Sequence, residues 1–292
     1  MSGYVEPAGN LSEAWLRTLE VVHAADGYAI NLMTTVSAPL AAEDVGIREE
    51  IDRILVDGHR SGTRVQSVDT VAGTIFPVDL YVAPGFAFQP GLDSSKTAEL
   101  DLAAADMYEA YLDILPILRT ESANQRGTYF GRMISWPGKT GGGFNQLAER
   151  VRVLRHERTL KRSKHNLDDI AVGGEAEGLW GHDVRDGVPA GLQVYAANDR
   201  RPRGFPCLVH IDLTVFQGRL SLAAVYRHQY LVTKAYGNLL GLSRLQGFLA
   251  QQTGYEVGEL VVNATMADLE EGTYTKSGVS DLIEAARAKA NS

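Results

Sequence analysis

The chain has 292 residues, of which 45% are hydrophobic and 22% charged, and its formal net charge is −8. This composition is typical of a globular protein with its own core. The negative charge argues against non-specific nucleic-acid binding, which requires a positive surface. The sequence contains no run of about 18 apolar residues, so no membrane-spanning helix is predicted. A single cysteine excludes an internal disulfide and, with no signal peptide at the start, favours a reducing cytoplasm.

The first half of the chain is predicted to be mainly helical. Apolar residues recur at helical spacing in several segments, for example at Trp15, Leu19 and Val22. We expect a first helix that begins near Asn10 or Ser12 and ends at Ala25, further helices at residues 43–57, 95–118 and 144–155, and a loop at 85–95. Helix and strand compete at residues 71–82, where Gly73 and Pro77 interrupt an apolar run.

The second half is predicted to be richer in strands. Apolar and polar residues alternate at 207–216 and again at 219–226, and Gln217-Gly218 between them is typical of a tight hairpin turn. Further strands are expected at 192–196 and 259–264, helices at 238–253 and 277–290, and a long loop at 158–188. No linker divides the chain, so the pattern indicates one α+β domain over residues 1–292.

Two features upstream of the hairpin have more than one interpretation. Seven basic residues between positions 150 and 164 are either a solvated helix end or a site for an anion such as phosphate. They are Arg150, Arg152, Arg155, Arg158, Lys161, Arg162 and Lys164. The glycine run at 140–143 is either a flexible turn or a phosphate-binding helix start, but it lacks the lysine of a P-loop.

The lone thiol is the main candidate for chemistry. Cys207 follows Pro206 at the start of a predicted strand, and Arg227 lies twenty positions later across the hairpin turn. A lone cysteine is often a small buried hydrophobic residue. Strand pairing about the turn would instead bring Arg227 near Cys207, where a positive charge lowers a thiol's pKa. The thiolate is the form that attacks carbon.

This block resembles the catalytic segment of thymidylate synthases and their pyrimidine hydroxymethylase relatives. Cys207, Gly218, Arg227 and Asn238 stand at the family's spacing without a gap. Weaker landmarks also match: Tyr129-Phe130-Gly131-Arg132, Trp136-Pro137, Phe144-Asn145-Gln146-Leu147 and residues 251–260. The resemblance covers residues 125–270, and residues 1–125 match only loosely.

The resemblance implies a role for each matching residue. Cys207 would be the nucleophile that adds to C6 of a pyrimidine, and Arg227 would lie beside its thiolate or bind an anionic group of the substrate. Asn238 would hydrogen-bond the N3–O4 edge of the ring, since a carboxamide both donates and accepts. Asp69 is the candidate acid/base carboxylate, or else a helix cap or surface acid. His228 would donate a proton or bind substrate, or else fill a polar niche.

The chain also departs from the family pattern. Pro189-Ala190-Gly191 stands where the family has an arginine pair for the 5′-phosphate. Tyr230 replaces the aspartate that meets the folate pterin, and Asp268-Leu269-Glu270 replaces a His-x-Tyr pair that binds the sugar. The substrate therefore either lacks a 5′-phosphate, or another basic group such as residues 200–203 binds it. Those residues are otherwise a solvated loop.

The sequence thus predicts a three-layer α+β fold of thymidylate-synthase type with a large mixed sheet. The expected activity is transfer of a methyl or hydroxymethyl unit from 5,10-methylenetetrahydrofolate to C5 of a pyrimidine-like nucleoside, nucleotide or related heterocycle. The absence of the family's cofactor-flanking tryptophans favours hydroxymethyl. We also expect a cytoplasmic homodimer without a metal site. The alternatives are a binding protein without catalysis and cysteine chemistry without folate.

Overall fold

The computed structural model of the protein describes residues 2–60, 62, 65–82, 94–121, 124, 127–136, 143–159, 170–171 and 206–290. Several sequence predictions concern segments outside these residues: the strand at 192–196, most of the loops at 85–95 and 158–188, most of the glycine run, and residues 189–191 and 200–203. Lys161, Arg162 and Lys164 also lie outside them.

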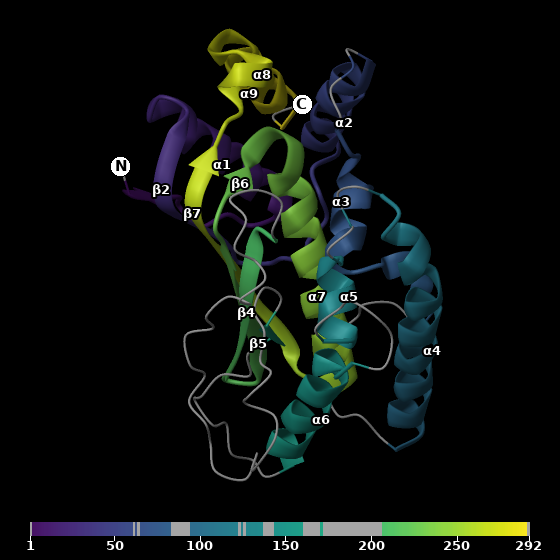
Figure 1. Ribbon diagram of the computed structural model, residues 1–292. Helices are drawn as coiled ribbons and strands as arrows, with labels where there is room; N and C mark the ends of the chain where they lie inside the picture. Colours follow the sequence, from purple (N-terminus) through teal and green to yellow (C-terminus); the bar gives the residue numbers. More distant parts are fainter. Residues whose placement is uncertain are drawn as a thin grey trace.

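The described strands form one mixed sheet (Figure 1). Its order is β1-β2-β7-β5-β4-β3, and β6 also pairs with β7. The strands are β1 Ser2–Tyr4, β2 Tyr28–Val36, β3 Ile170–Ala171, β4 Leu208–Phe216, β5 Arg219–Tyr226, β6 Gln229–Tyr230 and β7 Glu256–Asp268. β5 and β7 are parallel, whereas β4 is antiparallel to β5. The carboxyl ends of β5 and β7 and the start of β4 therefore lie at the same edge.

Helices pack against this sheet and against one another, which confirms the α+β class (Figure 1). They are α1 Leu11–Ala24, α2 Val45–Arg60, α3 Val68–Ile75, α4 Ser94–Leu118, α5 Tyr129–Ile134, α6 Gln146–Thr159, α7 Tyr236–Thr253, α8 Glu271–Tyr274 and α9 Lys276–Ala290. The structure also describes a 3-10 turn, η1 Val78–Leu80, and a π-helical turn, η3 Leu231–Ala235. None of the helices in the described part of the chain is both long and apolar enough to cross a membrane.

Helix α7 is buried along nearly its whole length because it lies between the sheet and helix α3 (Figure 1). Two glycines one turn apart allow α3 to approach closely. A Cβ at Gly237 would lie 2.6 Å from the Cβ of Val71, and a Cβ at Gly241 would lie 2.7 Å from the carbonyl oxygen of Ala72. This packing fixes the first turn of α7, which carries Asn238.

The predicted hairpin is confirmed. Gln217 and Gly218 both have positive φ, 50° and 77°, as expected for the type I′ turn that joins two twisted antiparallel strands. Leu208 pairs with Tyr226, so the start of β4 faces the end of β5. One residue further along each strand end, the N–H of Arg227 donates to the carbonyl of Cys207 at 2.9 Å. The turn therefore brings the cysteine and arginine backbones together, as the spacing predicted.

Other elements differ from the sequence predictions. The strand expected at 259–264 is the 13-residue β7, which pairs with both β2 and β5. The N-terminal half is not only helical, because β2 forms a full strand of the sheet. Ala29, Leu32, Thr34 and Val36 of this strand are buried, but the exposed neighbours Ile30 and Asn31 break the alternation, so the linear pattern is weak. At residues 71–82 the helix prevails up to Ile75, since α3 packs on α7.

Candidate active site

Cys207 lies directly before β4, at the edge where β5 and β7 end, and its side chain is partly buried. Its backbone N–H donates to the phenol oxygen of Tyr129 at 3.1 Å, and the N–H of Leu208 donates to the same oxygen at 3.3 Å. Burial raises the pKa of Tyr129 to about 12, so this phenol stays neutral near pH 7. The structure thus joins the upstream tyrosine landmark to the cysteine block.

The thiol does not have the lowered pKa that the sequence predicted. Burial raises the pKa of the Cys207 thiol, and the positive charge of Lys234 offsets only part of this effect. Arg227 meets Cys207 through its backbone, and burial lowers the pKa of its guanidinium. Lys234 lies in the turn before α7, and sequence reasoning missed its effect on this pKa because it matches no family motif.

The carboxylate of Glu270 shapes the turn that carries Lys234. It accepts hydrogen bonds from the backbone N–H groups of Val232 at 3.0 Å and Thr233 at 2.9 Å, and from the Thr233 hydroxyl at 2.7 Å. Burial raises the pKa of Glu270, and these hydrogen bonds counter the shift. The sequence resemblance aligns Glu270 with a sugar-binding position, whereas in the structure its oxygens bind the backbone and the Thr233 hydroxyl of this chain.

His228 also has a partner within the protein. Its Nε2 lies 3.1 Å from Oδ2 of Asp268, and its ring centroid lies 4.6 Å from that of Tyr230. The other oxygen of Asp268 accepts the backbone N–H of Glu270 at 2.7 Å. His228 is therefore oriented by Asp268, a residue that sequence reasoning noted only as a departure from the family pattern. Its binding of substrate stays a prediction.

Asn238 lies in the first turn of α7 and is only 6% exposed. Among the residues that the structure describes, its carboxamide makes no side-chain hydrogen bond. This carboxamide is free to bind a ligand that offers both a donor and an acceptor, as the N3–O4 edge of a uracil-like ring does.

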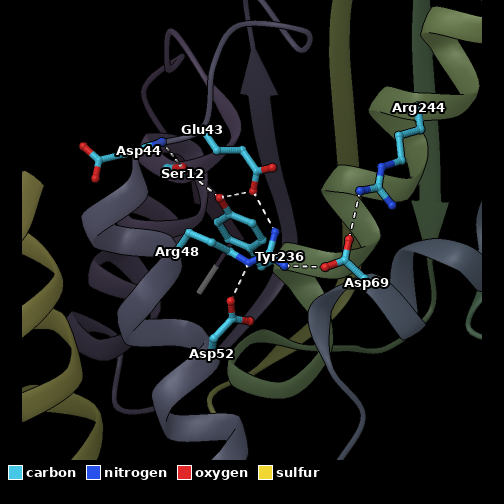
Figure 2. Close-up of polar contacts among 8 residues, drawn as sticks. All are labelled: Ser12, Glu43, Asp44, Arg48, Asp52, Asp69, Tyr236 and Arg244. Atoms are coloured by element: carbon cyan, nitrogen blue, oxygen red, sulfur yellow. Dashed lines mark hydrogen bonds and ion pairs between the residues drawn. The ribbon is translucent and has the colours of Figure 1, made fainter. Parts of the chain in front are cut away.

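Asp69 lies in the first turn of α3, within an ion-pair network that joins α2, α3 and α7 (Figure 2). One oxygen of Asp69 accepts from Arg48 at 2.6 Å and the other from Arg244 at 2.9 Å. Arg48 also pairs with Glu43 at 3.1 Å and Asp52 at 2.9 Å. Figure 2 shows Glu43 and Arg48 next to the ring of Tyr236, the residue two before Asn238, with Asp69 and Arg244 to one side.

Tyr236 connects this network to the start of α7. Its hydroxyl donates to Glu43 at 2.7 Å and lies 2.8 Å from the hydroxyl of Ser12 (Figure 2). The guanidinium carbon of Arg48 lies 5.8 Å from the centre of the Tyr236 ring, a cation–π distance. The network therefore holds the beginning of α7, and with it Asn238, against α2 and α3.

The contacts of Asp69 favour its ionised form. Burial raises the pKa of this carboxyl, but the hydrogen bonds from Arg244 and Arg48 outweigh burial and lower it overall. A general acid or base works best when its pKa is near the working pH. The pKa of Asp69 is instead lowered by two guanidinium groups, so this carboxyl is poorly suited to proton transfer. The acid/base role of Asp69 stays a prediction, and the geometry favours a structural one.

The Asp69→Asn variant separates these two roles. If the role is structural, we expect a loss of about 1 kcal/mol or less at pH 7, because the side chain is 59% exposed and solvent screens its ion pairs. A lowered folded-state pKa adds stability that is present above the unfolded value of about 3.9 and is lost as pH falls through the folded pKa. Urea unfolding should therefore show the difference from wild type shrinking in acid.

The exposed acid Asp106 on α4 provides the matched control. Asp106→Asn should leave the free energy of unfolding unchanged both at pH 7 and in acid. A variant Asp69→Asn that keeps full stability at neutral pH but loses turnover would instead assign the proton-transfer role to this carboxyl.

The described arginines of the basic segment bind groups of this chain. Arg155 contacts Asp101 at 2.7 Å and the side chain of Gln252 at 2.7 Å, and Arg152 pairs with Glu149 at 2.6 Å. A cavity of about 300 Å³ lies among these residues, between α4, α6 and the last turn of α7. Because Asn238 lies in the first turn of α7, this cavity is at the other end of that helix from the cysteine block.

Comparison with known proteins shows limited similarity. No protein-family model matches the chain. The chain is 28% identical over 72 residues to a protein of Methanothermobacter marburgensis that bears the name "Putative thymidylate synthase". The match covers 25% of this chain and 32% of the relative, so the chain spans about a third of that protein's length. This similarity supports a distant, thymidylate-synthase-like relationship.

Proposed function

We propose that this protein is a transferase of the thymidylate-synthase type, which adds a one-carbon unit to C5 of a pyrimidine-like nucleoside, nucleotide or related heterocycle. The observation that carries the proposal is the position of Cys207. Its backbone is fixed by the Tyr129 hydroxyl at the sheet edge where β5 and β7 end. The similarity to the Methanothermobacter protein supports the same reaction class.

The proposed chemistry begins with the thiol. After Cys207 loses its proton, the sulfur donates an electron pair to C6 of the ring and a sulfur–carbon bond forms. The ring electrons move through C5 to the C4 carbonyl oxygen, which makes C5 nucleophilic. Asn238 would hold the ring by its N3–O4 edge. After the new carbon–carbon bond has formed, loss of the C5 proton would expel the donor's amine nitrogen from the transferred carbon. Water would then add to that carbon for a hydroxymethyl product, or hydride from the donor for a methyl product, and departure of the thiolate would restore the ring.

We propose 5,10-methylenetetrahydrofolate as the donor, which when bound supplies the one-carbon unit. Tyr230 is 42% exposed and its ring lies beside that of His228, and an exposed aromatic ring can stack on a flat heterocycle. These two residues would hold the pterin ring. A charged contact from position 230 is absent, since tyrosine replaces the family's aspartate, so we expect weaker folate binding than in typical members.

The direct test is a substrate screen. Candidate nucleosides and nucleotides, with and without a 5′-phosphate, are incubated with the protein and methylenetetrahydrofolate, and products are analysed by mass spectrometry. We expect a gain of one carbon, with an added oxygen if the product is hydroxymethyl. A product formed without folate would indicate folate-independent cysteine chemistry. No product from any heterocycle, together with no folate binding by calorimetry, would favour the binding-protein alternative.

We also propose a homodimer that forms through the sheet. Helix α1 contacts β2, while Tyr28 and Ile30 of the same strand are 47% and 48% exposed. Large apolar side chains on a strand favour burial against a partner surface. Light scattering should give twice the chain mass of 31.7 kDa for wild type and the single mass for Ile30→Glu. Leu102→Glu, on the exposed side of α4, is the control that should stay dimeric. A monomeric wild type would contradict this proposal.

A further inference from the structure

We propose that the cavity between α4, α6 and the last turn of α7 binds an uncharged, flat heterocycle, at a site separate from the cysteine block. Helices α4 and α6 both pack on α7 (Figure 1). The volume of about 300 Å³ lies at the lower end of the range for small-molecule sites. Gln252 in its wall lies about 21 Å along α7 from Asn238, so the two sites do not share a ligand.

The wall of this cavity contains a buried hydroxyl. Tyr108 of α4 lines the cavity, and its hydroxyl makes no hydrogen bond among the residues that the structure describes. The Tyr108 ring packs near the rings of Phe130 and Phe248, with centroids 6.4 Å and 6.5 Å away. Burial raises the pKa of Tyr108, so the hydroxyl is neutral at pH 7 and can both donate and accept. A ligand in the cavity would supply the hydrogen bond that this hydroxyl lacks.

The charged groups of the wall already have partners of opposite charge. Arg155 donates to Asp101 at 2.7 Å, and Arg152 pairs with Glu149 at 2.6 Å. A ligand with a full charge would therefore enter the cavity without a counter-charge of its own. An uncharged ligand avoids this cost, which argues against phosphate as the ligand of this cavity.

The guanidinium of Arg155 favours a flat ligand with hydrogen-bond acceptors. Three of its five N–H groups are in use, by Asp101 and by the carbonyl and side-chain oxygens of Gln252, so two donors remain. A guanidinium also stacks on planar rings. The ring of a heterocycle would meet this group, and its polar edge would meet Tyr108.

Hydrogen bonds between α4 and α7 hold the wall in place before any ligand arrives. Gln252 is only 1% exposed, and its side-chain nitrogen donates to the hydroxyl of Tyr81 at 3.1 Å and to the carbonyl of Leu100 at 2.8 Å. Its side-chain oxygen accepts from Arg155 at 2.7 Å. A wall that is already ordered loses little entropy on binding, which favours affinity for a small molecule.

The test measures binding of adenine, cytosine, uracil and inorganic phosphate to the full-length protein at pH 7 by ligand-observed NMR titration. We expect at least one base to bind and phosphate not to bind. Tyr108→Phe should weaken binding of that base about fivefold to tenfold, because it removes one hydrogen bond. Ala148→Trp should abolish binding, because Ala148 is an exposed residue of the wall and tryptophan would fill the cavity. Asn238→Ala should keep it, which distinguishes this cavity from the candidate active site.

Thermal unfolding without ligand gives a second, independent readout. Tyr108→Phe should unfold at the wild-type temperature or above it, because the hydroxyl that it removes has no partner in the described part of the chain. Tyr111→Phe is the matched control on the same helix. The hydroxyl of Tyr111 lies 2.6 Å from that of Thr128, so its removal should lower the unfolding temperature.

Three binding results would overturn the proposal: no binding of any base, binding of phosphate instead, or base binding that Asn238→Ala removes and Ala148→Trp keeps. A Tyr108→Phe variant that loses as much stability as Tyr111→Phe would also contradict it, since the hydroxyl would then have a partner. A failed screen for one-carbon transfer leaves this inference intact, because none of these measurements uses Cys207 or folate.

Discussion

The Cys207→Ala variant should lose one-carbon transfer by about a thousand-fold or more while keeping its fold, because alanine has no atom that can form the bond to C6. The fold should persist since the hydrogen bond from position 207 to Tyr129 uses the backbone N–H, which alanine retains. The side chain is only partly buried, so its truncation leaves little cavity. Product formation is measured by mass spectrometry, and stability by thermal unfolding.

Two further measurements sharpen this prediction. In wild type, the intact mass of the protein after incubation with a substrate should show a covalent adduct, and this adduct should be absent from Cys207→Ala. Cys207→Ser is the closest control in size, and it should also lose activity because a hydroxyl ionises far less readily than a thiol. Activity retained by the alanine variant would contradict the covalent mechanism, whatever the substrate.

The Gly241→Ala variant should destabilise the fold by about 2 kcal/mol or more, because the contact between α3 and α7 leaves no room for an added methyl group. The added Cβ would lie 2.7 Å from the carbonyl oxygen of Ala72 and 2.9 Å from the Cβ of Ile75. These neighbours belong to the backbone and to the base of a side chain, so α3 must move away from α7. Urea unfolding measures the loss directly.

Gly73→Ala is the matched control, because Gly73 also lies inside a helix, α3, but has no atom within 4 Å of the position of an added Cβ. There alanine should stabilise the protein by up to about 1 kcal/mol, through its higher helix propensity. The two substitutions are chemically identical, so their difference isolates the helix contact. Equal effects at both positions would show that α3 and α7 do not approach as closely as described.

Contacts between distant segments decided what the sequence left open in the candidate site. The position of Asp69 in the first turn of a helix follows from its neighbour Ser67, whose side chain caps α3 by accepting the N–H of Thr70 at 3.2 Å. Its pairing with Arg244, 175 positions away, does not follow from any local pattern. The two arginine contacts argue against an acid/base role for Asp69. Only the fold reveals them, so the sequence alone left that role open.

The sequence by itself determined the local elements that neighbouring residues control. Asn10 caps α1 by accepting the N–H of Glu13 at 2.9 Å, and Gln217-Gly218 sets the register that joins Cys207 to Arg227. Caps and tight turns depend on backbone preferences within a few residues, so a linear pattern reveals them.

Only the tertiary structure decided the surroundings of the thiol. The hydroxyl of Tyr129 reaches Cys207 from 78 positions upstream, and Gln66 reaches Lys234 from 168 positions away. The burial that raises the pKa of Cys207 likewise depends on how the sheet, η3 and α5 pack together. The burial of an atom and the charge around it depend on groups that are close in space but far apart in the chain. A pattern of neighbouring residues therefore does not reveal them.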